Sequence, residues 1–368
     1  MNTFASNQTT LAATTLAAAA VSKSRVGLLG LLLLLLAAWP QQGLAQSRVG
    51  TTAAPFLTLG TGARGQALGQ AYSTQATGAD ALFWNPAGAA RAYQGRYRSN
   101  LFATHHNWFA DIDYNAVGLT IPVGVGTLGL SATFVDYGEL DLRTERDQED
   151  TGQTFGASDL AIGITYARPL TESFYFGGTA KFIRQGIYDM AAQTVAFDFG
   201  FVLESAYFNG LVLSATIMNF GGKMQMEGVN AQVAFDPDPN QSGNNNSTPA
   251  EIQLESWDLP LAFKFGMSYP VARVDAVELR LMAEADQTND NNLNGDLGAQ
   301  LRYATGAFTL DGRVGYKDLF LDDAVDSHFT FGGGVAVRVA DYRVAFDYAY
   351  TPFDFLDATQ MIDVRVFF

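Results

Sequence analysis

The sequence predicts an all-β protein: a 14-stranded antiparallel transmembrane β-barrel with a short N-terminal helical plug or hatch in its lumen. Three observations predict this fold: an export signal, regular alternation of apolar and polar residues from residue 96 onward, and no apolar run after residue 45 that could span a bilayer as a helix. An exported chain without such a helix either stays in solution or spans as a closed barrel, because lipid offers no partner to open sheet edges.

Residues 1–45 have the order and size of a secretory signal peptide. Lys23 and Arg25 precede an apolar run of 14 residues from Val26 to Trp39, and Gly43-Leu44-Ala45 supplies small residues for cleavage. A membrane-spanning helix needs about 20 apolar residues, so this run is too short for an anchor. We expect cleavage after Ala45, and the absence of cysteine argues against a lipid-anchored N-terminus.

Residues 96–368 contain fourteen segments in which apolar and polar residues alternate, as they do in barrel strands that face lipid. For example, Val195, Phe197 and Phe199 lie on one phase and Asp198 on the other. A large secreted sandwich or propeller would also alternate, but the lengths of the links favour the barrel. The predicted strands are 96–106, 111–121, 126–137, 158–168, 173–187, 190–205, 209–220, 257–270, 275–286, 294–304, 306–317, 328–339, 341–351 and 359–368.

Charged residues in eight of these strands fall on the phase opposite the large apolar side chains. A lipid-facing Arg or Lys costs about 2–4 kcal/mol at the bilayer midplane, so we expect these charges to line the lumen. Bases and acids nearly balance there, which favours a wall that pairs with a plug over an ion-selective pore. The predicted lumen charges are Asp198, Lys264, Glu278, Arg280, Arg302, Asp311, Arg313, Arg338, Arg343, Asp347 and Arg365.

The predicted links between strands alternate in length, as in outer-membrane barrels with short periplasmic turns and longer outer loops. Five of the seven links at one end are long or strongly polar. We therefore expect the N-terminus to be periplasmic and the barrel to lie in the outer membrane of a Gram-negative bacterium. The short links are 122–125, 169–172, 206–208, 271–274 and those near Thr305 and Ala340.

Residues 46–95 lack this alternation and are predicted to form the plug. Their glycines permit close backbone contact with the wall, and residues 67–76 can form a short helix. Asn85-Pro86 indicates a turn, because proline fixes φ and asparagine can bond its own backbone. Arg64, alone among small residues, is predicted to pair with a wall carboxylate as a latch. The motif residues of the plug are Phe56, Gly60, Arg64, Gly65, Gly69, Tyr72, Asp80, Trp84, Asn85, Pro86 and Gly88.

The run from Pro55-Phe56-Leu57 to Asn85-Pro86-Ala87-Gly88 resembles the N-terminal signature of the PorV/PorQ family of outer-membrane proteins. That family belongs with the long-chain fatty-acid transporter (FadL-like) barrels, and Ala89 stands where it usually has Leu. The resemblance implies a 14-stranded barrel with an inward-folded hatch, in a bacterium of the Bacteroidota type. The PorV branch implies a role in type IX protein secretion, with the secretion channel and the C-terminal sorting domains of secreted proteins as partners.

Apolar residues in the predicted outer loops indicate a surface that binds a partner or a ligand. We therefore favour a partner-binding component of type IX secretion, surrounded by outer-membrane lipid. The alternative is a FadL-like passive channel with a hydrophobic ligand, in which Gly332, Gly333 and Gly334 weaken a strand for lateral exit. The loop residues are Trp108, Met224, Met226, Phe320, Phe353, Phe355 and Leu356.

The formal net charge of -15 argues against nucleic-acid binding. We also predict no enzyme and no cofactor: His105 and His106 are adjacent on a strand and point to opposite faces, and a lipid hydrolase would need a serine and an acid beside one of them. Asp290 to Gly295 fits the first half of a calcium loop, but its twelfth position is Leu301 instead of Glu. We interpret that segment as a polar hairpin and predict no metal site.

Overall fold

The computed structural model describes residues 50–94, 97–143, 148, 151–238, 240, 247–320, 328–353 and 356–368. The predicted signal peptide at 1–45 lies outside the described residues. Within the described ranges, no helix is long and apolar enough to cross a membrane.

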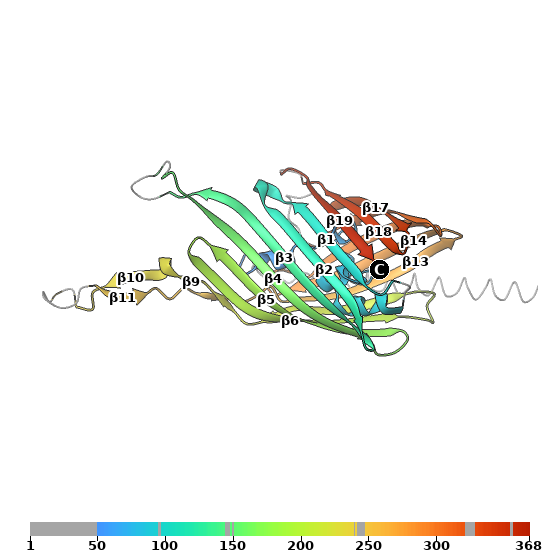
Figure 1. The fold of residues 1–368 in the computed structure, drawn as a ribbon, viewed down its shortest axis with the longest axis horizontal. Helices are drawn as coiled ribbons and strands as arrows, with labels where there is room; N and C mark the ends of the chain where they lie inside the picture. The colour runs from blue at the N-terminus through green and yellow to red at the C-terminus, as the bar shows by residue number, and fades with distance from the viewer. Residues whose placement is uncertain are drawn as a thin grey trace, which may run out of the picture. The chain divides into compact units, whose positions relative to one another are not determined.

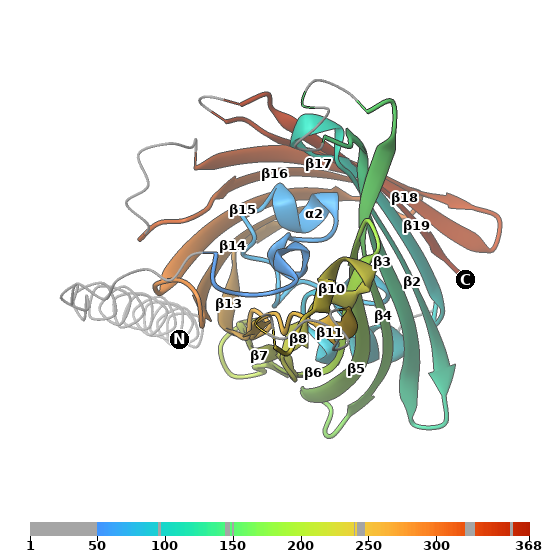
Figure 2. The same ribbon diagram turned by 90° about the vertical axis from the view of Figure 1, so that its left-hand side faces the viewer.

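The described residues form a closed antiparallel barrel of fourteen strands, which confirms the predicted fold class (Figures 1 and 2). The barrel closes where Asn100 in the first strand pairs with Phe367 in the last. The strands are β1 Asn100–Asn107, β2 Asp113–Val123, β3 Gly126–Asp141, β4 Thr154–Pro169, β5 Phe174–Ile187, β6 Met190–Glu204, β7 Val212–Gly221, β13 Ala262–Val274, β14 Val277–Thr288, β15 Asn294–Ala304, β16 Phe308–Tyr316, β17 Phe329–Val339, β18 Tyr342–Thr351 and β19 Thr359–Phe367.

Smaller pairings fill the long link between β7 and β13, which the sequence predicted as a loop up to residue 256; the strand predicted from 257 begins only at Ala262. The strands β10 and β11 form a hairpin that projects beyond the barrel strands in Figure 1. Strand β9 extends the edge of β6, and β8 pairs with β12. These segments are too short to show an alternating pattern. They are β8 Met224–Gln225, β9 Glu227–Gly228, η5 Val229–Ala231, β10 Gln232–Phe235, β11 Thr248–Glu251 and β12 Ser256–Trp257.

The two ends of the barrel differ in their links, as the sequence predicts. We call one the short-turn end and the opposite one the long-loop end, where β7 and β13 are joined through 222–261. The chain enters β1 at the short-turn end, where Ser99 and Phe368 exchange two backbone hydrogen bonds of 3.0 Å. At the short-turn end, strands are joined through 124–125, 170–173, 205–211, 275–276, 305–307 and 340–341.

The two faces of the wall also follow the predicted alternation. In β6 the side chains of Val195 and Phe197 are 49% and 44% exposed on the outer face, whereas Asp198 is 1% exposed on the lumen side. Arg313, Asp347 and Arg365 are likewise buried in the lumen. Arg338 differs from the prediction: it has the lumen phase but is exposed, because β17 ends one residue later at the short-turn rim.

The plug lies inside the ring of strands, where Figure 2 shows α2. Thr52 bridges to Asp258, and the Ala54 amide donates to Gln185 Oε1 at 2.8 Å, so the described chain begins at the long-loop end and then runs through the lumen to the short-turn end. The helical elements are η1 Pro55–Thr58, α2 Ala63–Gln66, η2 Asp80–Phe83 and η3 Pro86–Gln94 in the plug, with η4 Phe109–Asp111 between β1 and β2.

The helix predicted at 67–76 is replaced by turns, since Gly69 and Gln70 have φ values of 62° and 70°. At Gly69 the plug also touches the wall: a Cβ added to Gly315 would lie 1.9 Å from the Gly69 nitrogen. Plug and wall backbones therefore approach each other as closely as the predicted glycine role requires.

The glycine triplet of β17 lies in an unbroken part of the wall. Strand β17 pairs without a break with both β16 and β18 through Gly332, Gly333 and Gly334. A Cβ on Gly332 would lie 2.4 Å from Ala67 Cβ, and one on Gly334 would lie 2.0 Å from Asp347 Oδ1. Gly332 and Gly334 therefore make room for the plug and for a lumen carboxylate, and the weakened strand stays a prediction.

Candidate functional site

A network of buried charges joins the plug to the wall. Arg64 lies 3.5 Å from Asp80 of the plug, and Arg365 of β19 reaches the same carboxylate at 3.7 Å. The Tyr72 hydroxyl donates to Asp80 at 2.5 Å. Burial raises the pKa of Tyr72 well above its usual range, so the hydroxyl stays protonated as a donor.

The latch predicted for Arg64 therefore has a different partner. Its carboxylate is Asp80 of the plug and not an acid of the wall, because Asp347 is already engaged by Arg313 at 2.7 Å and by Arg365. The network continues along the wall from Arg313 to Asp311 at 3.0 Å. Within this network, plug and wall meet through Asp80 and Arg365.

Two wall carboxylates bind the plug backbone, and the sequence interpretation missed both as plug contacts. Glu284 accepts hydrogen bonds from the Ser73 amide at 2.9 Å and from its hydroxyl at 2.6 Å. Asp363 accepts one from the Ala63 amide at 2.6 Å. The alternation of residues places both carboxylates on the lumen face. The sequence does not reveal that their partners are backbone amides of the plug. Lys264, another predicted lumen charge, pairs with Asp286 at 2.9 Å.

The Asn-Pro turn closes the plug at the short-turn end. The Ala87 amide donates to Asn85 Oδ1 at 3.1 Å, which is the predicted bond of asparagine to its own backbone. Asn85 Nδ2 also donates to the carbonyl of Phe201 in β6 at 3.1 Å. Arg91, which was not singled out, binds Glu204 and the Thr74 carbonyl, each at 2.7 Å. Arg91 is a lone basic residue in an alanine-rich run. The same sequence signal led to the prediction that Arg64 forms an ion pair.

A cavity of about 410 Å³, here called the outer pocket, opens at the long-loop end. Of the predicted loop residues, Met224 and Met226 line it; Met224 is 2% exposed and Met226 is half-buried, so the two belong to a pocket instead of an open loop surface. The lining residues are Gly50, Thr52 and Ala53 of the plug, Gln185 and Ala192 of β5 and β6, and Met224, Met226, Leu254, Glu255 and Trp257 of the β7–β13 link.

A second cavity of about 40 Å³, here called the lumen cavity, lies between the plug and the wall. It is large enough for about one water molecule. Its apolar lining includes Phe56, Leu82 and Met218. Its polar lining includes the ion pair between Lys181 and Asp198, whose atoms are 2.9 Å apart.

The remaining loop residues do not meet the outer pocket. Trp108, Phe109 and Phe353 pack together at the ends of β1 and β18, with ring centroids 4.5 and 4.8 Å apart in tilted and edge-to-face contacts. Phe320 packs against Gly295, and Leu356 is exposed. Phe355 lies outside the described residues. The loop residues that were predicted to form one surface therefore lie in several separate groups.

The histidine and asparagine-rich segments have structural neighbours. His105 is exposed and His106 is buried, so the two point to opposite faces as predicted. His106 packs against Trp108 on the lumen side, with ring centroids 4.8 Å apart. Asp290, in the segment compared with a calcium loop, accepts a hydrogen bond from Thr52 Oγ1 at 2.8 Å.

No protein-family model matches the sequence, and no curated protein matches it. Several solved structures are similar to it. The CymD monoaromatic hydrocarbon channel has a TM-score of 0.54 at 12% identity, covering 83% of this chain and 96% of that one. The Pseudomonas putida toluene transporter TodX has a TM-score of 0.51 at 11% identity, covering 84% and 97%.

A Pseudomonas aeruginosa FadL homologue is also similar, with a TM-score of 0.51 at 11% identity over 84% of this chain and 98% of that one. At such identities a likeness speaks for the fold alone. The chain therefore has the closed 14-stranded architecture of FadL-like barrels, which fits the outer membrane of a Gram-negative bacterium.

Proposed function

We propose that this protein is a passive outer-membrane channel for hydrophobic small molecules. The observation that carries the proposal is the outer pocket, whose volume of about 410 Å³ suits a small organic ligand. Similar structures that are named as a monoaromatic hydrocarbon channel and a toluene transporter support the same class of compound.

The lining of the outer pocket favours uncharged ligands. Met224 and Met226 have flexible side chains that can adapt to different apolar shapes, and Trp257 adds an aromatic face. Two of the polar lining residues are already bonded within the protein, Thr52 to Asp290 and Gln185 to the Ala54 amide. A third polar lining residue, Glu255, is exposed, and the remaining lining is mainly apolar.

Uptake of radiolabelled toluene by a Gram-negative host that produces the protein tests the proposal. We expect uptake above that of the empty host. Met226→Glu should reduce it about tenfold, because an unpaired carboxylate in an apolar pocket costs more than 1.4 kcal/mol. Val229→Glu places the same charge at a 63% exposed position of the same link and should leave uptake unchanged. Equal uptake with and without the protein would reject the channel.

The second candidate is the partner-binding role in type IX secretion implied by the PorV/PorQ resemblance. The cluster of the Trp108, Phe109 and Phe353 rings at the long-loop end favours it as an aromatic contact for a protein partner. The motif residues of the plug do not separate the two candidates, because Arg64, Asp80 and Asn85 are buried in contacts that hold the plug.

A further inference from the structure

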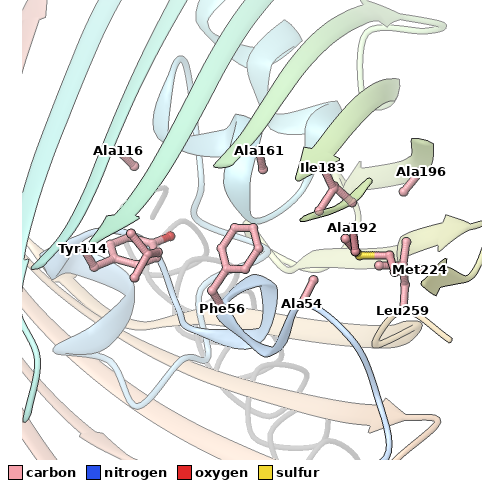
Figure 3. Packing of buried hydrophobic residues seen from close by; sticks show 11 residues of the cluster. Ala54, Phe56, Tyr114, Ala116, Ala161, Ile183, Ala192, Ala196, Met224 and Leu259 are labelled. Atoms are coloured by element: carbon pink, nitrogen blue, oxygen red, sulfur yellow. The ribbon is translucent and has the colours of Figure 1, made fainter. Parts of the chain in front are cut away.

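The lumen face of the wall is chemically uneven. Toward the long-loop end, plug and wall meet in a buried apolar cluster to which Phe56, Tyr114 and Ile183 belong (Figure 3). Along β15 to β19, by contrast, each of the five strands places one arginine on its lumen phase, so positive charge is concentrated on this part of the wall. These residues are Arg302, Arg313, Arg338, Arg343 and Arg365.

The wall carboxylates that pair with these arginines are each shared between two of them. Asp311 contacts Arg302 at 2.8 Å and Arg313 at 3.0 Å. Asp347 contacts Arg313 at 2.7 Å and also contacts Arg365. Two acids of the wall therefore compensate three arginines.

Other acids nearby do not restore the balance. Asp80 of the plug brings a further guanidinium group, that of Arg64. Asp363 accepts a hydrogen bond from a plug amide, and Asp341 is an exposed turn residue that has a partner. Glu278 of β14 is already bound by two arginines at its own end of the barrel. Even with Asp363 and Asp341 included, six guanidinium groups face five carboxylates among the described residues.

Arg343 is half-buried, and among the described residues it forms no ion pair. Its Nη2 donates to Thr309 Oγ1 at 3.3 Å, and its charged neighbours include the guanidinium groups of Arg302 and Arg365. Arg338, which also has no ion pair in the described part of the chain, is its Cα partner across β17 and β18. Like charges directly opposite on neighbouring strands are destabilising, so an anion between the two arginines would stabilise this part of the wall.

We propose that Arg338, Arg343 and Thr309 form a binding site for a phosphate group at the short-turn mouth of the lumen. Strand β17 ends one residue after Arg338 and β18 begins one residue before Arg343, so the site lies at the rim. Guanidinium forks from two strands and a hydroxyl from a third suit a tetrahedral anion with several acceptor oxygens better than a planar carboxylate. The site is separate from both cavities and goes beyond the proposed channel.

Titration of the full-length protein in mild detergent with inorganic phosphate tests the site, with the ionic strength held constant by chloride. We expect saturable binding that Arg343→Gln weakens about tenfold, because charge-assisted hydrogen bonds to the anion are lost. Arg168→Gln is the matched control and should leave the affinity unchanged. It removes the same charge at the same end of the barrel, but from an exposed position on the outer face of β4.

Two further variants separate the site from a general loss of positive charge. Arg343→Lys keeps the charge but loses the planar fork, so its affinity should lie between those of the unmodified protein and Arg343→Gln. Arg338→Gln changes an exposed residue and should weaken binding several-fold. It decides the question if Arg343→Gln does not assemble, as judged by heat-modifiable migration on a gel.

The phosphorus content of an organic extract of the purified protein distinguishes a lipid headgroup from free phosphate. A headgroup predicts lipid phosphorus that the unmodified protein and Arg168→Gln retain and that Arg343→Gln loses. Free phosphate predicts equal lipid phosphorus in all three, with a difference in the titration alone. If Arg343→Gln and Arg338→Gln match the unmodified protein in both measurements, the phosphate site is overturned.

Discussion

At the scale of single residues, Asp80 joins the buried charges of the plug to those of the wall. It is the only acidic residue between 50 and 94, and it contacts Arg64, Arg365 and the Tyr72 hydroxyl. Loss of Arg64 would leave the contact between Asp80 and Arg365 intact. Loss of the Asp80 charge would leave two buried guanidinium groups with less compensation, so the carboxylate matters more than the plug arginine.

We therefore expect Asp80→Asn to loosen the plug and raise leak conductance in planar bilayers, and Arg64→Ala to do so less. Removing one partner of a buried ion pair costs about 3–5 kcal/mol. Asp275→Asn is a suitable control, because this exposed turn residue has a φ of 48° that asparagine tolerates. Conductance of Asp80→Asn no higher than that of the control would contradict this role.

Alternation along a strand predicts which face a charge is on, but not which partner it meets. Asp198 and Arg313 were correctly placed in the lumen because their phase alone decides it. The predicted partner of Arg64, a carboxylate of the wall, was wrong. The pairing depends on how the plug folds back to bring Asp80 beside Arg64. The outer pocket residues Gln185 and Ala192 were missed for the same reason.

At the scale of elements, the Asn-Pro turn packs closely against strands β5 and β6. A Cβ on Gly200 of β6 would lie 2.0 Å from Asn85 Oδ1, and one on Gly177 of β5 would lie 2.4 Å from the Pro86 carbonyl carbon. The wall is therefore shaped for this turn, and Arg91 fixes the segment after it to Glu204.

Gly200→Ala should expel the turn, because overpacking of this kind costs about 1–3 kcal/mol. The displaced plug should then be cut by trypsin at Arg91, which the unmodified protein protects through its contacts with Glu204 and Thr74. Gly312→Ala is the matched control in β16, since an added Cβ there meets nothing within 4 Å. If the two variants resist trypsin equally, the turn does not depend on this space.

The barrel strands could be predicted because each has one face toward lipid, so apolar and polar residues alternate along all of them. The strand predicted at 294–304 coincides with β15, and that at 173–187 differs from β5 by one residue. Strand β3 continues to Asp141, beyond the predicted 137, after a register shift between Asp136 and Glu139. Such a shift reverses the phase of the pattern, so alternation alone ends the strand too early.

At the scale of the whole molecule, the fold followed from the sequence but the two cavities did not. Cavity volume is what remains after plug, wall and loops have packed, and no single segment encodes it. The outer pocket combines the start of the plug, the ends of β5 and β6, and a link whose small strands were not predicted. Function therefore has to be decided on the assembled protein.

Purification of the full-length protein in mild detergent distinguishes the two candidate functions, because a channel and a secretion component retain different bound molecules. The channel predicts a hydrophobic small molecule in the organic extract, recovered with the unmodified protein and much reduced with Met226→Glu. The secretion role predicts a large outer-membrane partner or secreted C-terminal domains, lost when Phe353 and Leu356 are replaced by serine. These two residues lie apart from the outer pocket, so their replacement should leave the small molecule bound. Loss of the small molecule in this variant would show that the pocket and these loops do not act separately.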